Sequence, residues 1–332
     1  MTADLARAIH EASNNRTPKM LRTPLQGSIG LSRLFDANVL LKCEHLQTTG
    51  SFKYRGASNK IRLLPPDRRD LGVITASSGN HGQAVALAGR DAGVPVTVYA
   101  SSKASPAKLA AIRAYGAELR LIDGGGLEAE LAASAEAAKT GRLFVSPYND
   151  LDVIAGQGTI GLEIIEDAPH IDAVFLAVGG GGLASGVGVA LNAHAPKAKL
   201  IGCWPTNSPA LLRAIEAGEI HDVAETDTIS DGTAGGVEPG SVTLELCTKV
   251  IHQRVEVDEL LIKEAMWALA EHDHWMVEGA AGVALAGLFR LRHEIKGKTV
   301  AIVLCGRNIS AETYWSAMSE GRAQHAFTQM DV

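Results

Sequence analysis

Aromatic residues are scarce in this sequence, at 5% of its 332 residues, whereas glycine occurs 35 times. Tight backbone turns are therefore expected to shape its sites more than aromatic surfaces do. The formal net charge is -6 and the lysines and arginines form no cluster, which argues against nucleic acid as a partner. No apolar run reaches the roughly 18 residues that a membrane-spanning helix needs, so no membrane partner is expected.

The chain also lacks a cysteine framework. Its four cysteines (Cys43, Cys203, Cys247 and Cys305) are scattered and form no CxxC pair, so structural disulfides are not expected and a reducing cytoplasm is the predicted location. The first residues contain no apolar core of the kind that signal peptides carry. The residue composition, 46% hydrophobic and 20% charged, is typical of a globular protein. The chain is long enough for two modest domains.

Apolar, β-branched runs alternate along the chain with longer helical patterns, which predicts parallel strands joined by crossover helices. The pattern favours two sheet-centred blocks of the α/β class, with helices on both faces of each sheet. The strands are expected at residues 73–77, 94–100, 118–122 and 143–146 in the first block, and at 173–178, 199–204 and 299–304 in the second.

Four successive glycines, Gly179-Gly180-Gly181-Gly182, follow one of these strands and precede a predicted helix. Such a run lets the backbone approach a bound group closely, and the helix N-terminus adds partial positive charge, so a phosphate is the favoured ligand. The run also fits a loose dinucleotide fingerprint, but Trp204 stands where that fingerprint needs an acidic residue. A dinucleotide is therefore disfavoured, and a tight turn without a ligand is the structural alternative.

Two further segments have chemical potential but are weak when taken alone. Residues 77–82, SSGNHG, put short polar side chains at a helix N-terminus, where they suit an anion but serve equally as helix caps. Lys53 lies between Phe52 and Tyr54, and partial desolvation would favour the neutral amine that attacks an aldehyde. A solvated lysine is the simpler interpretation of that segment by itself.

Together the segments SFKYRGA, SSGNHGQA, GGGGLASG and LCGRN resemble the fold-type-II pyridoxal-phosphate enzymes, in the threonine dehydratase and serine racemase branch. They stand in that family's order over nearly the whole chain. The resemblance implies a tryptophan synthase β-like α/β fold of parallel twisted sheets flanked by helices, with a large domain of residues 1–54 and 148–332 and a small domain of 55–147. It also implies pyridoxal 5′-phosphate as the cofactor and a homodimer. EHLQTTGSFKYRGASNK, SDGTAGGVEPGS and CGRNIS further resemble hydroxyectoine-utilisation dehydratases.

The resemblance assigns roles to individual residues. Lys53 is expected to bind the cofactor covalently and to act as the base, with Phe52 packed against the cofactor ring. Ser78 is the second catalytic candidate, because racemases use a serine at this place as the acid on the opposite face. The other expected contacts are Asn80 to the ring hydroxyl, Glu278 near the ring, Cys305 at the pyridine nitrogen, Gly179, Gly180, Gly181 and Gly182 around the phosphate, and Ser77, Gly79 and His81 around the substrate carboxylate.

Cys305 carries a mechanistic expectation. A neutral thiol does not keep the ring nitrogen protonated as a carboxylate would, so the ring is a weaker electron sink and prompt loss of a β-substituent is favoured. A buried cysteine at a strand end is the structural alternative. No metal is expected, because related racemases carry a glutamate before the strand-end proline where this chain has Cys203-Trp204-Pro205, and hard cations need several oxygen ligands.

The sequence therefore predicts elimination of water from a small β-hydroxy amino acid to give an oxo acid and ammonia. Threonine, serine, hydroxyaspartate and a hydroxyectoine-derived hydroxy-diamino acid are the candidate substrates. A racemase of the same fold, a non-catalytic phosphate-binding module and a nicotinamide oxidoreductase are the alternatives. Asp231, Thr233 and Glu238 are candidates for contacting an amino-bearing side chain, although loops of this composition usually form only turns.

Overall fold

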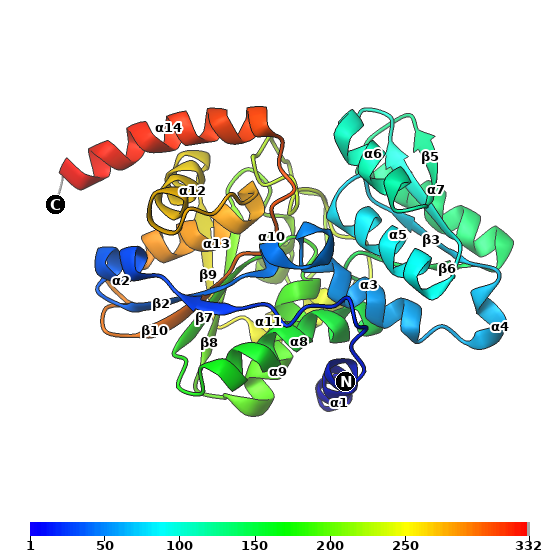
Figure 1. Ribbon diagram of the computed structural model, residues 1–332, viewed down its shortest axis with the longest axis horizontal. Helices are drawn as coiled ribbons and strands as arrows, with labels where there is room; N and C mark the ends of the chain where they lie inside the picture. The colour runs from blue at the N-terminus through cyan, green and yellow to red at the C-terminus, as the bar shows by residue number, and fades with distance from the viewer. Residues whose placement is uncertain (331–332) are drawn as a thin grey trace.

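The computed structural model describes residues 1–330 and contains two sheets (Figure 1). The larger sheet has the order β1-β2-β10-β7-β8-β9 and consists of β1 (Leu25–Gly27), β2 (Asn38–Lys42), β7 (Ala173–Ala177), β8 (Lys199–Pro205), β9 (Gln253–Val257) and β10 (Thr299–Val303). The smaller sheet has the order β5-β4-β3-β6 and consists of β3 (Val73–Ala76), β4 (Val96–Ser101), β5 (Glu118–Ile122) and β6 (Leu143–Phe144).

Every pair of neighbouring strands in these two sheets is parallel except β1 with β2. β10 lies between β2 and β7, with Val303 opposite Lys42 and Ile302 opposite Phe175. Because parallel strands end at the same edge of a sheet, the segments after β2, β7 and β10 emerge side by side.

Helices cover the faces of both sheets, as the layers in Figure 1 show. Those packed with the larger sheet are α1 (Thr2–Asn14), α2 (Ile29–Phe35), α8 (Leu151–Asp167), α9 (Gly182–His194), α10 (Ala210–Ala217), α11 (Val242–Val250), α12 (Glu259–Asp273), α13 (Gly279–Arg290) and α14 (Ala311–Met330). The others are α3 (Lys53–Arg62), α4 (Pro66–Arg69), α5 (Asn80–Ala92), α6 (Pro106–Ala114) and α7 (Gly126–Thr140).

The α/β class with parallel sheets flanked by helices is confirmed, and the differences from expectation lie at element ends. Ser105 caps α6 and accepts a hydrogen bond from the Lys108 amide. α8 begins at Leu151, because the side chain of Asp150 accepts hydrogen bonds from two backbone amides and caps the helix. α1, α2, β2, α11 and β9 were not predicted from the sequence. The division into domains at residues 54 and 148 stays a prediction.

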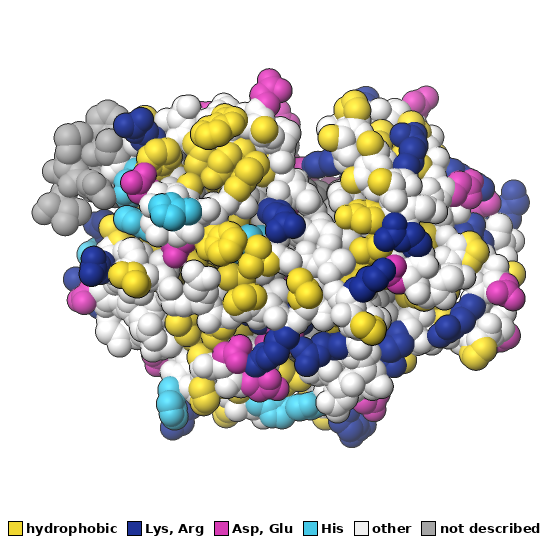
Figure 2. Space-filling model, viewed as in Figure 1, with side chains coloured by type: hydrophobic (Ala, Val, Ile, Leu, Met, Phe, Trp, Pro, Cys, Tyr) yellow, Lys and Arg dark blue, Asp and Glu magenta, His cyan; other side chains and the backbone are white. Residues whose placement is uncertain are grey.

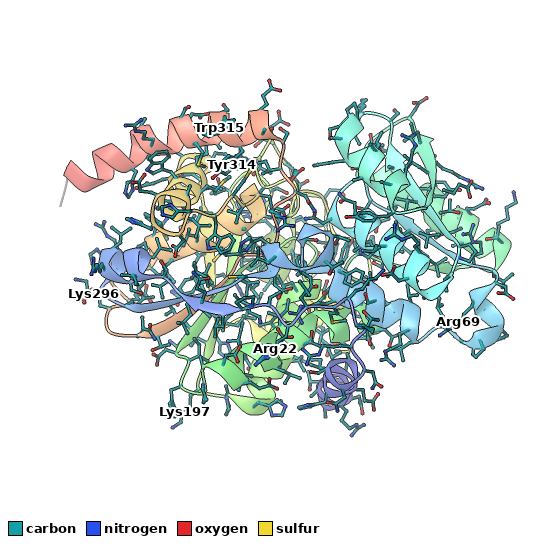
Figure 3. All side chains as sticks on the ribbon, in the orientation of Figure 1. Arg22, Arg69, Lys197, Lys296, Tyr314 and Trp315 are labelled. Carbon is teal, nitrogen blue, oxygen red and sulfur yellow. The ribbon has the colours of Figure 1, made fainter. Side chains whose placement is uncertain are left out.

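The indole of Trp204, where a ribose-binding acid was sought in the sequence, is fully buried in β8. At the surface, α14 turns one of two adjacent aromatics inward: Tyr314 is 8% exposed and Trp315 68% exposed (Figure 3). Apolar side chains gather around α12 and α14, and a notch separates this part of the molecule from the part that holds α6 (Figure 2). No helix within residues 1–330 is long and apolar enough to span a membrane.

Candidate active site

The separate motifs of the sequence meet in one cavity at the carboxyl ends of β7 and β10. Phe52 and Lys53 enter it from the start of α3, Asn80 from the start of α5, and Cys305 from just beyond β10. The remaining lining residues are Tyr148, residues 177–184, Gly232, Thr233, Glu278 and Ala280. Ser77, Ser78, Gly79 and His81 do not line this cavity, although the loop that contains them runs directly into Asn80.

Backbone contacts fix Lys53 beside the end of β10. The amide of Phe52 donates to the carbonyl of Cys305 at 3.0 Å, and Ser51 pairs with Gly306 in an isolated antiparallel bridge. The Lys53 amine donates to the carbonyl of Pro147 at 2.8 Å. Removal from water lowers the pKa of Lys53 to about 8, against the smaller opposing effects of Cys305, Glu278 and Glu130. A partly neutral amine near pH 8 fits the nucleophile that the sequence predicted.

The four glycines form a turn with no space for side chains. A Cβ on Gly180 would stand 2.4 Å from the ring of Tyr148, and one on Gly179 would stand 2.9 Å from Thr233. Gly181 has a φ of +89°, which strains other residues, and Gly182 opens α9. The turn therefore brings bare backbone and a helix N-terminus to the cavity, an arrangement suited to a phosphate.

Glu278 joins Asn80 and Asn308 in a closed set of hydrogen bonds. The Asn80 amide donates to Glu278 Oε1 at 2.8 Å, the Asn308 backbone donates to Oε2 at 2.9 Å, and the Asn308 side chain donates to Asn80 at 2.6 Å. Burial and then the charge of Asp231 raise the pKa of Glu278 to about 7. Asn308 was not singled out from the sequence, where it appeared only inside the LCGRN motif.

Cys305 is buried at 3% exposure. Burial, and then the charge of Glu278, raise the pKa of its thiol well above the ordinary value. The group facing this part of the cavity is therefore a neutral thiol at physiological pH, as the sequence analysis expected of it.

The loop before α5 is shaped by its own contacts. Ser77 Oγ accepts a hydrogen bond from the Gly79 amide at 3.1 Å. His81 is 2% exposed, and its Nε2 lies 3.0 Å from the carbonyl oxygen of Val145. Burial, and then the charge of Lys53, lower the pKa of His81 to about 3, so its ring is neutral and near the lysine. The contacts of this loop with a substrate carboxylate stay a prediction.

Two residues near the cavity were missed by sequence reasoning. Tyr148 packs against Gly180 and Gly182, and its hydroxyl accepts a hydrogen bond from the Glu238 amide at 2.9 Å. Glu130, on α7, lies close enough to influence the charge of Lys53 and Tyr148. Neither residue belongs to a recognisable motif. Glu130 lies in a segment whose sequence indicates only an alanine-rich helix.

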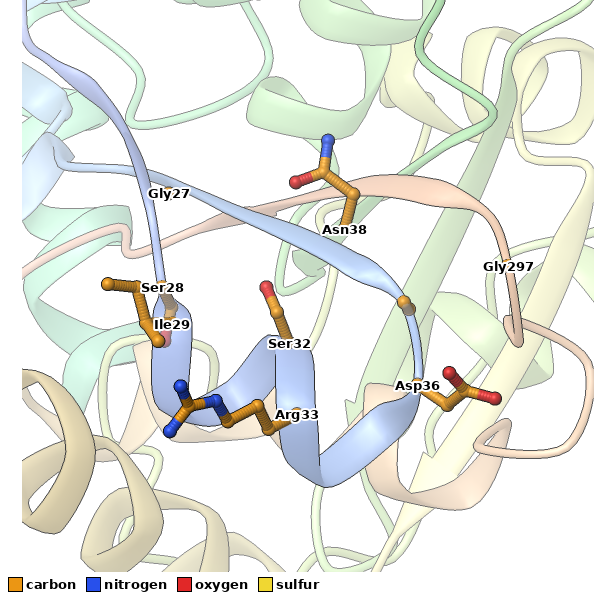
Figure 4. Close-up of a pocket in the computed structure, with 9 residues that line it drawn as sticks. Gly27, Ser28, Ile29, Ser32, Arg33, Asp36, Asn38 and Gly297 are labelled. Carbon is orange, nitrogen blue, oxygen red and sulfur yellow. The ribbon is translucent and has the colours of Figure 1, made fainter.

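A second hollow, of about 720 Å³, lies at α2 and the adjoining strand ends (Figure 4). Its charged side chains are Arg33 and Asp36, and none of the predicted site residues lines it. The smaller cavity is the better candidate because it gathers the nucleophilic and titratable groups. Among the described residues, no three of His, Cys, Asp and Glu are grouped so that they could hold a metal ion.

Comparisons with known proteins agree with this arrangement. Residues 17–306 match the family model described as "Pyridoxal-phosphate dependent enzyme". An L-threonine ammonia-lyase of Thermotoga maritima is 41% identical over 94% of this chain and 78% of its own length. Threonine deaminase isoform 2 from Solanum lycopersicum superposes with a TM-score of 0.90 at 30% identity, covering 96% of this chain and 93% of its own. Maize serine racemase has a TM-score of 0.87 at 30% identity, covering 96% and 98%.

Proposed function

The chain belongs to the family of pyridoxal-phosphate dependent enzymes, and from that premise we propose that it removes water from a small β-hydroxy amino acid and releases ammonia and an oxo acid. It is a lyase of the threonine dehydratase type, with pyridoxal 5′-phosphate as its cofactor. The hypotheses of a non-catalytic phosphate-binding module and of a nicotinamide oxidoreductase are set aside. The amine of Lys53, facing a bare glycine turn across one cavity, is the observation that carries the proposal.

The residues present fit this cofactor. The turn at Gly179–Gly182 presents bare backbone and a helix N-terminus to the phosphate, and the pKa of Lys53 favours bond formation with an aldehyde. Cys305 would offer a neutral thiol to the ring nitrogen. Phe52, Asn80 and Glu278 border the same space and would hold the ring. When bound, the cofactor makes the Cα proton of an attached amino acid acidic.

The protein's own groups would then carry out proton transfer and positioning. Lys53, once released from the cofactor, would take the Cα proton, since its lowered pKa provides neutral amine near pH 8. The loop of Ser77, Gly79 and His81 would hold the substrate carboxylate at the start of α5. The buried set of Asn80, Glu278 and Asn308 would keep the ring side of the site rigid.

Motifs around Lys53 and Cys305 that resemble hydroxyectoine-utilisation dehydratases support a hydroxylated diamino acid as the substrate, with threonine, serine and hydroxyaspartate as alternatives. We also propose a large domain of residues 1–54 and 148–332 with a small domain of 55–147, a homodimer, and a cytoplasmic location. The placement of the strands in two separate sheets supports the division into domains.

The test is release of ammonia and oxo acid from a panel of β-hydroxy amino acids, with Lys53→Ala as the control. Borohydride should fix the cofactor to Lys53 in the purified, cofactor-supplemented protein, and peptide mapping should find the label there. A colourless protein with no label at Lys53 and no oxo acid from any substrate would overturn the proposal.

Racemisation is the second candidate, favoured by the presence of Ser78 beside the site and by the likeness to maize serine racemase. A racemase would need Ser78 as the acid opposite Lys53. Chiral analysis of serine after incubation separates the two activities. Appearance of the D-isomer, lost in Ser78→Ala while oxo-acid formation persists, would establish racemisation as a second activity.

A further inference from the structure

Asn308 contacts three parts of the active site without lining the cavity itself. Its side-chain nitrogen donates to the carbonyl of Thr49 at 2.9 Å and to Asn80 Oδ1 at 2.6 Å. Its backbone amide donates to Glu278 Oε2 at 2.9 Å. The residue therefore joins the turn before Lys53, the start of α5 and the start of α13.

The Thr49 carbonyl is a fixed point for this contact. Thr49 has a φ of +69° and Gly50 a φ of +76°, so two successive residues are left-handed, a conformation that is strained for threonine. The Gly50 carbonyl accepts a hydrogen bond from the Arg307 amide at 2.9 Å, which ties the turn to the segment that carries Asn308. A Cβ on Gly50 would stand 2.9 Å from Asn308 Oδ1, so the turn and the asparagine are closely packed.

These contacts determine which way the amide of Asn80 faces. A backbone carbonyl only accepts hydrogen bonds, so the atom of Asn308 that meets Thr49 is its nitrogen. The same nitrogen faces Asn80, so Asn80 must turn its oxygen toward it. The Asn80 nitrogen then points to the Glu278 carboxylate, which accepts at both oxygens. Thr49, through Asn308, thus fixes an amide that is otherwise free to rotate by half a turn.

One N–H of Asn80 is left for a ligand. The amide nitrogen carries two hydrogens and makes one hydrogen bond within the described residues, to Glu278. Asn80 lines the cavity together with Lys53. In pyridoxal 5′-phosphate the ring hydroxyl is next to the aldehyde that Lys53 is proposed to bind, so its oxygen comes close to that lysine. An N–H donor at this place favours the ionised hydroxyl, whereas an amide oxygen would favour the neutral one.

We propose that Asn308 is a positioning residue that makes Asn80 a hydrogen-bond donor to the ring oxygen of the cofactor. The inference rests on the proposed function, since it needs pyridoxal 5′-phosphate in the cavity. Asn308 lies outside the lining of that cavity and acts through Asn80. Its contribution is therefore specific to the ring hydroxyl and adds nothing to the binding of the phosphate.

Asn308→Ala removes both side-chain hydrogen bonds and frees the Asn80 amide to rotate. The affinity of the apoprotein for pyridoxal 5′-phosphate should fall about fivefold, the loss expected for one hydrogen bond. The affinity for 3-deoxypyridoxal 5′-phosphate, which lacks the ring hydroxyl, should stay within about twofold of the wild-type value. Absorbance titration measures both dissociation constants. In the holoenzyme spectrum, the band of the ionised ring should lose intensity in favour of the band of the neutral ring.

Asn308→Asp keeps the size of the side chain but replaces its donor by acceptors. Both N–H groups of Asn80 then face carboxylates, so none is left for the ring oxygen, and the same selective loss of affinity is expected. Asn38→Ala is the matched control, because Asn38 is an exposed asparagine in β2 whose side chain bonds only Thr299 within the described residues. It should leave both affinities and the spectrum unchanged.

A double variant tests whether Asn308 acts through Asn80. Asn80→Ala should itself weaken the binding of pyridoxal 5′-phosphate, and adding Asn308→Ala to it should cost little more. Full additivity of the two losses would overturn the proposal, as would equal weakening of both cofactors in a folded Asn308 variant, since either result indicates a general structural role. An unchanged affinity and spectrum in Asn308→Ala would overturn it too. Failure of the proposed function is recognised separately, because the wild-type protein would then bind no cofactor and give no borohydride label at Lys53.

Discussion

Two clusters of charge share the first turn of α3 and differ in how they are paired. Arg55, fully buried, donates to both oxygens of Glu44 and of Glu163 at 2.8 Å, and Lys42 completes the set at 2.6 Å from Glu163. Two residues earlier, Lys53 has a lowered pKa, and the pKa values of Glu130 and Glu278 around it are raised. The charges that hold the fold are paired with opposite charges, whereas Lys53 and Glu278 beside the cavity have hydrogen-bond partners but no ion pair within the described residues.

Removing Lys53 should have the largest functional effect. Lys53→Ala is expected to lower oxo-acid formation by about 10⁴-fold or more, because it deletes both the covalent anchor and the base. Its chemical stability in urea should stay near that of the wild type, since the native amine is partly desolvated. Steady-state turnover measures the loss of activity, and urea unfolding measures the stability. A large loss of stability would contradict the view that Lys53 serves the reaction and not the fold.

Breaking the paired cluster should have the largest structural effect. Arg55→Met leaves Glu44 and Glu163 buried without their main partner, which is expected to cost about 3–5 kcal/mol of unfolding free energy. Urea denaturation of the apoprotein measures it. A cost below about 1 kcal/mol, the range of exposed ion pairs, would show that the network is not the anchor of α3.

A matched pair of glutamates sharpens the comparison. Glu163→Gln should destabilise the protein by several kcal/mol, on the order of 3, because Arg55 and Lys42 lose a carboxylate partner. Glu278→Gln should cost less than about 1 kcal/mol at pH 8. The pKa of Glu278 is about 7 in the folded protein and lower in the unfolded chain, so its ionisation lowers the folding stability as the pH rises between these two values. A glutamine at this position does not ionise and carries no such loss. Similar losses in both variants would contradict the argument.

The pH dependence of cofactor binding should show the smallest effect. The neutral form of Lys53 increases as the pH rises through its pKa of about 8. The rate at which the apoprotein binds pyridoxal 5′-phosphate should therefore rise between about pH 7 and 9 and level off above, whereas an ordinary lysine would still be gaining neutral amine beyond pH 10. Stopped-flow absorbance measures the rate, and a continued rise beyond pH 10 would exclude the lowered pKa.

Much of the fold and of the site could be predicted from local sequence signals. The glycine run, the SSGNHG segment and the end of the strand before Cys305 could be placed because each sits at a strand–helix junction, and parallel strands bring such junctions together. Starts of helices were harder, since α8 depends on one cap from Asp150.

Other site features depend on contacts between distant segments. Asn308 reaches Asn80 across 228 positions, and the pKa of Glu130 on α7 responds to the charges of Glu238 and Lys53, which are distant in the sequence. Nothing in the local residue pattern encodes these approaches. The ion pairs of Arg55 could not be predicted from the sequence either, because a fully buried arginine is rare and its partners lie 11 and 108 positions away.

The position of β10 also sets the order in which the site can form during synthesis. β10 fills the place between β2 and β7 although it follows every other strand of the described residues in the chain. Until β10 has been synthesised, no strand connects β2 with β7, and until residue 305 has been synthesised Phe52 lacks the Cys305 carbonyl that accepts its hydrogen bond. A nascent chain therefore holds Lys53 without its pocket, and the cofactor site can form only after residue 305 has been synthesised.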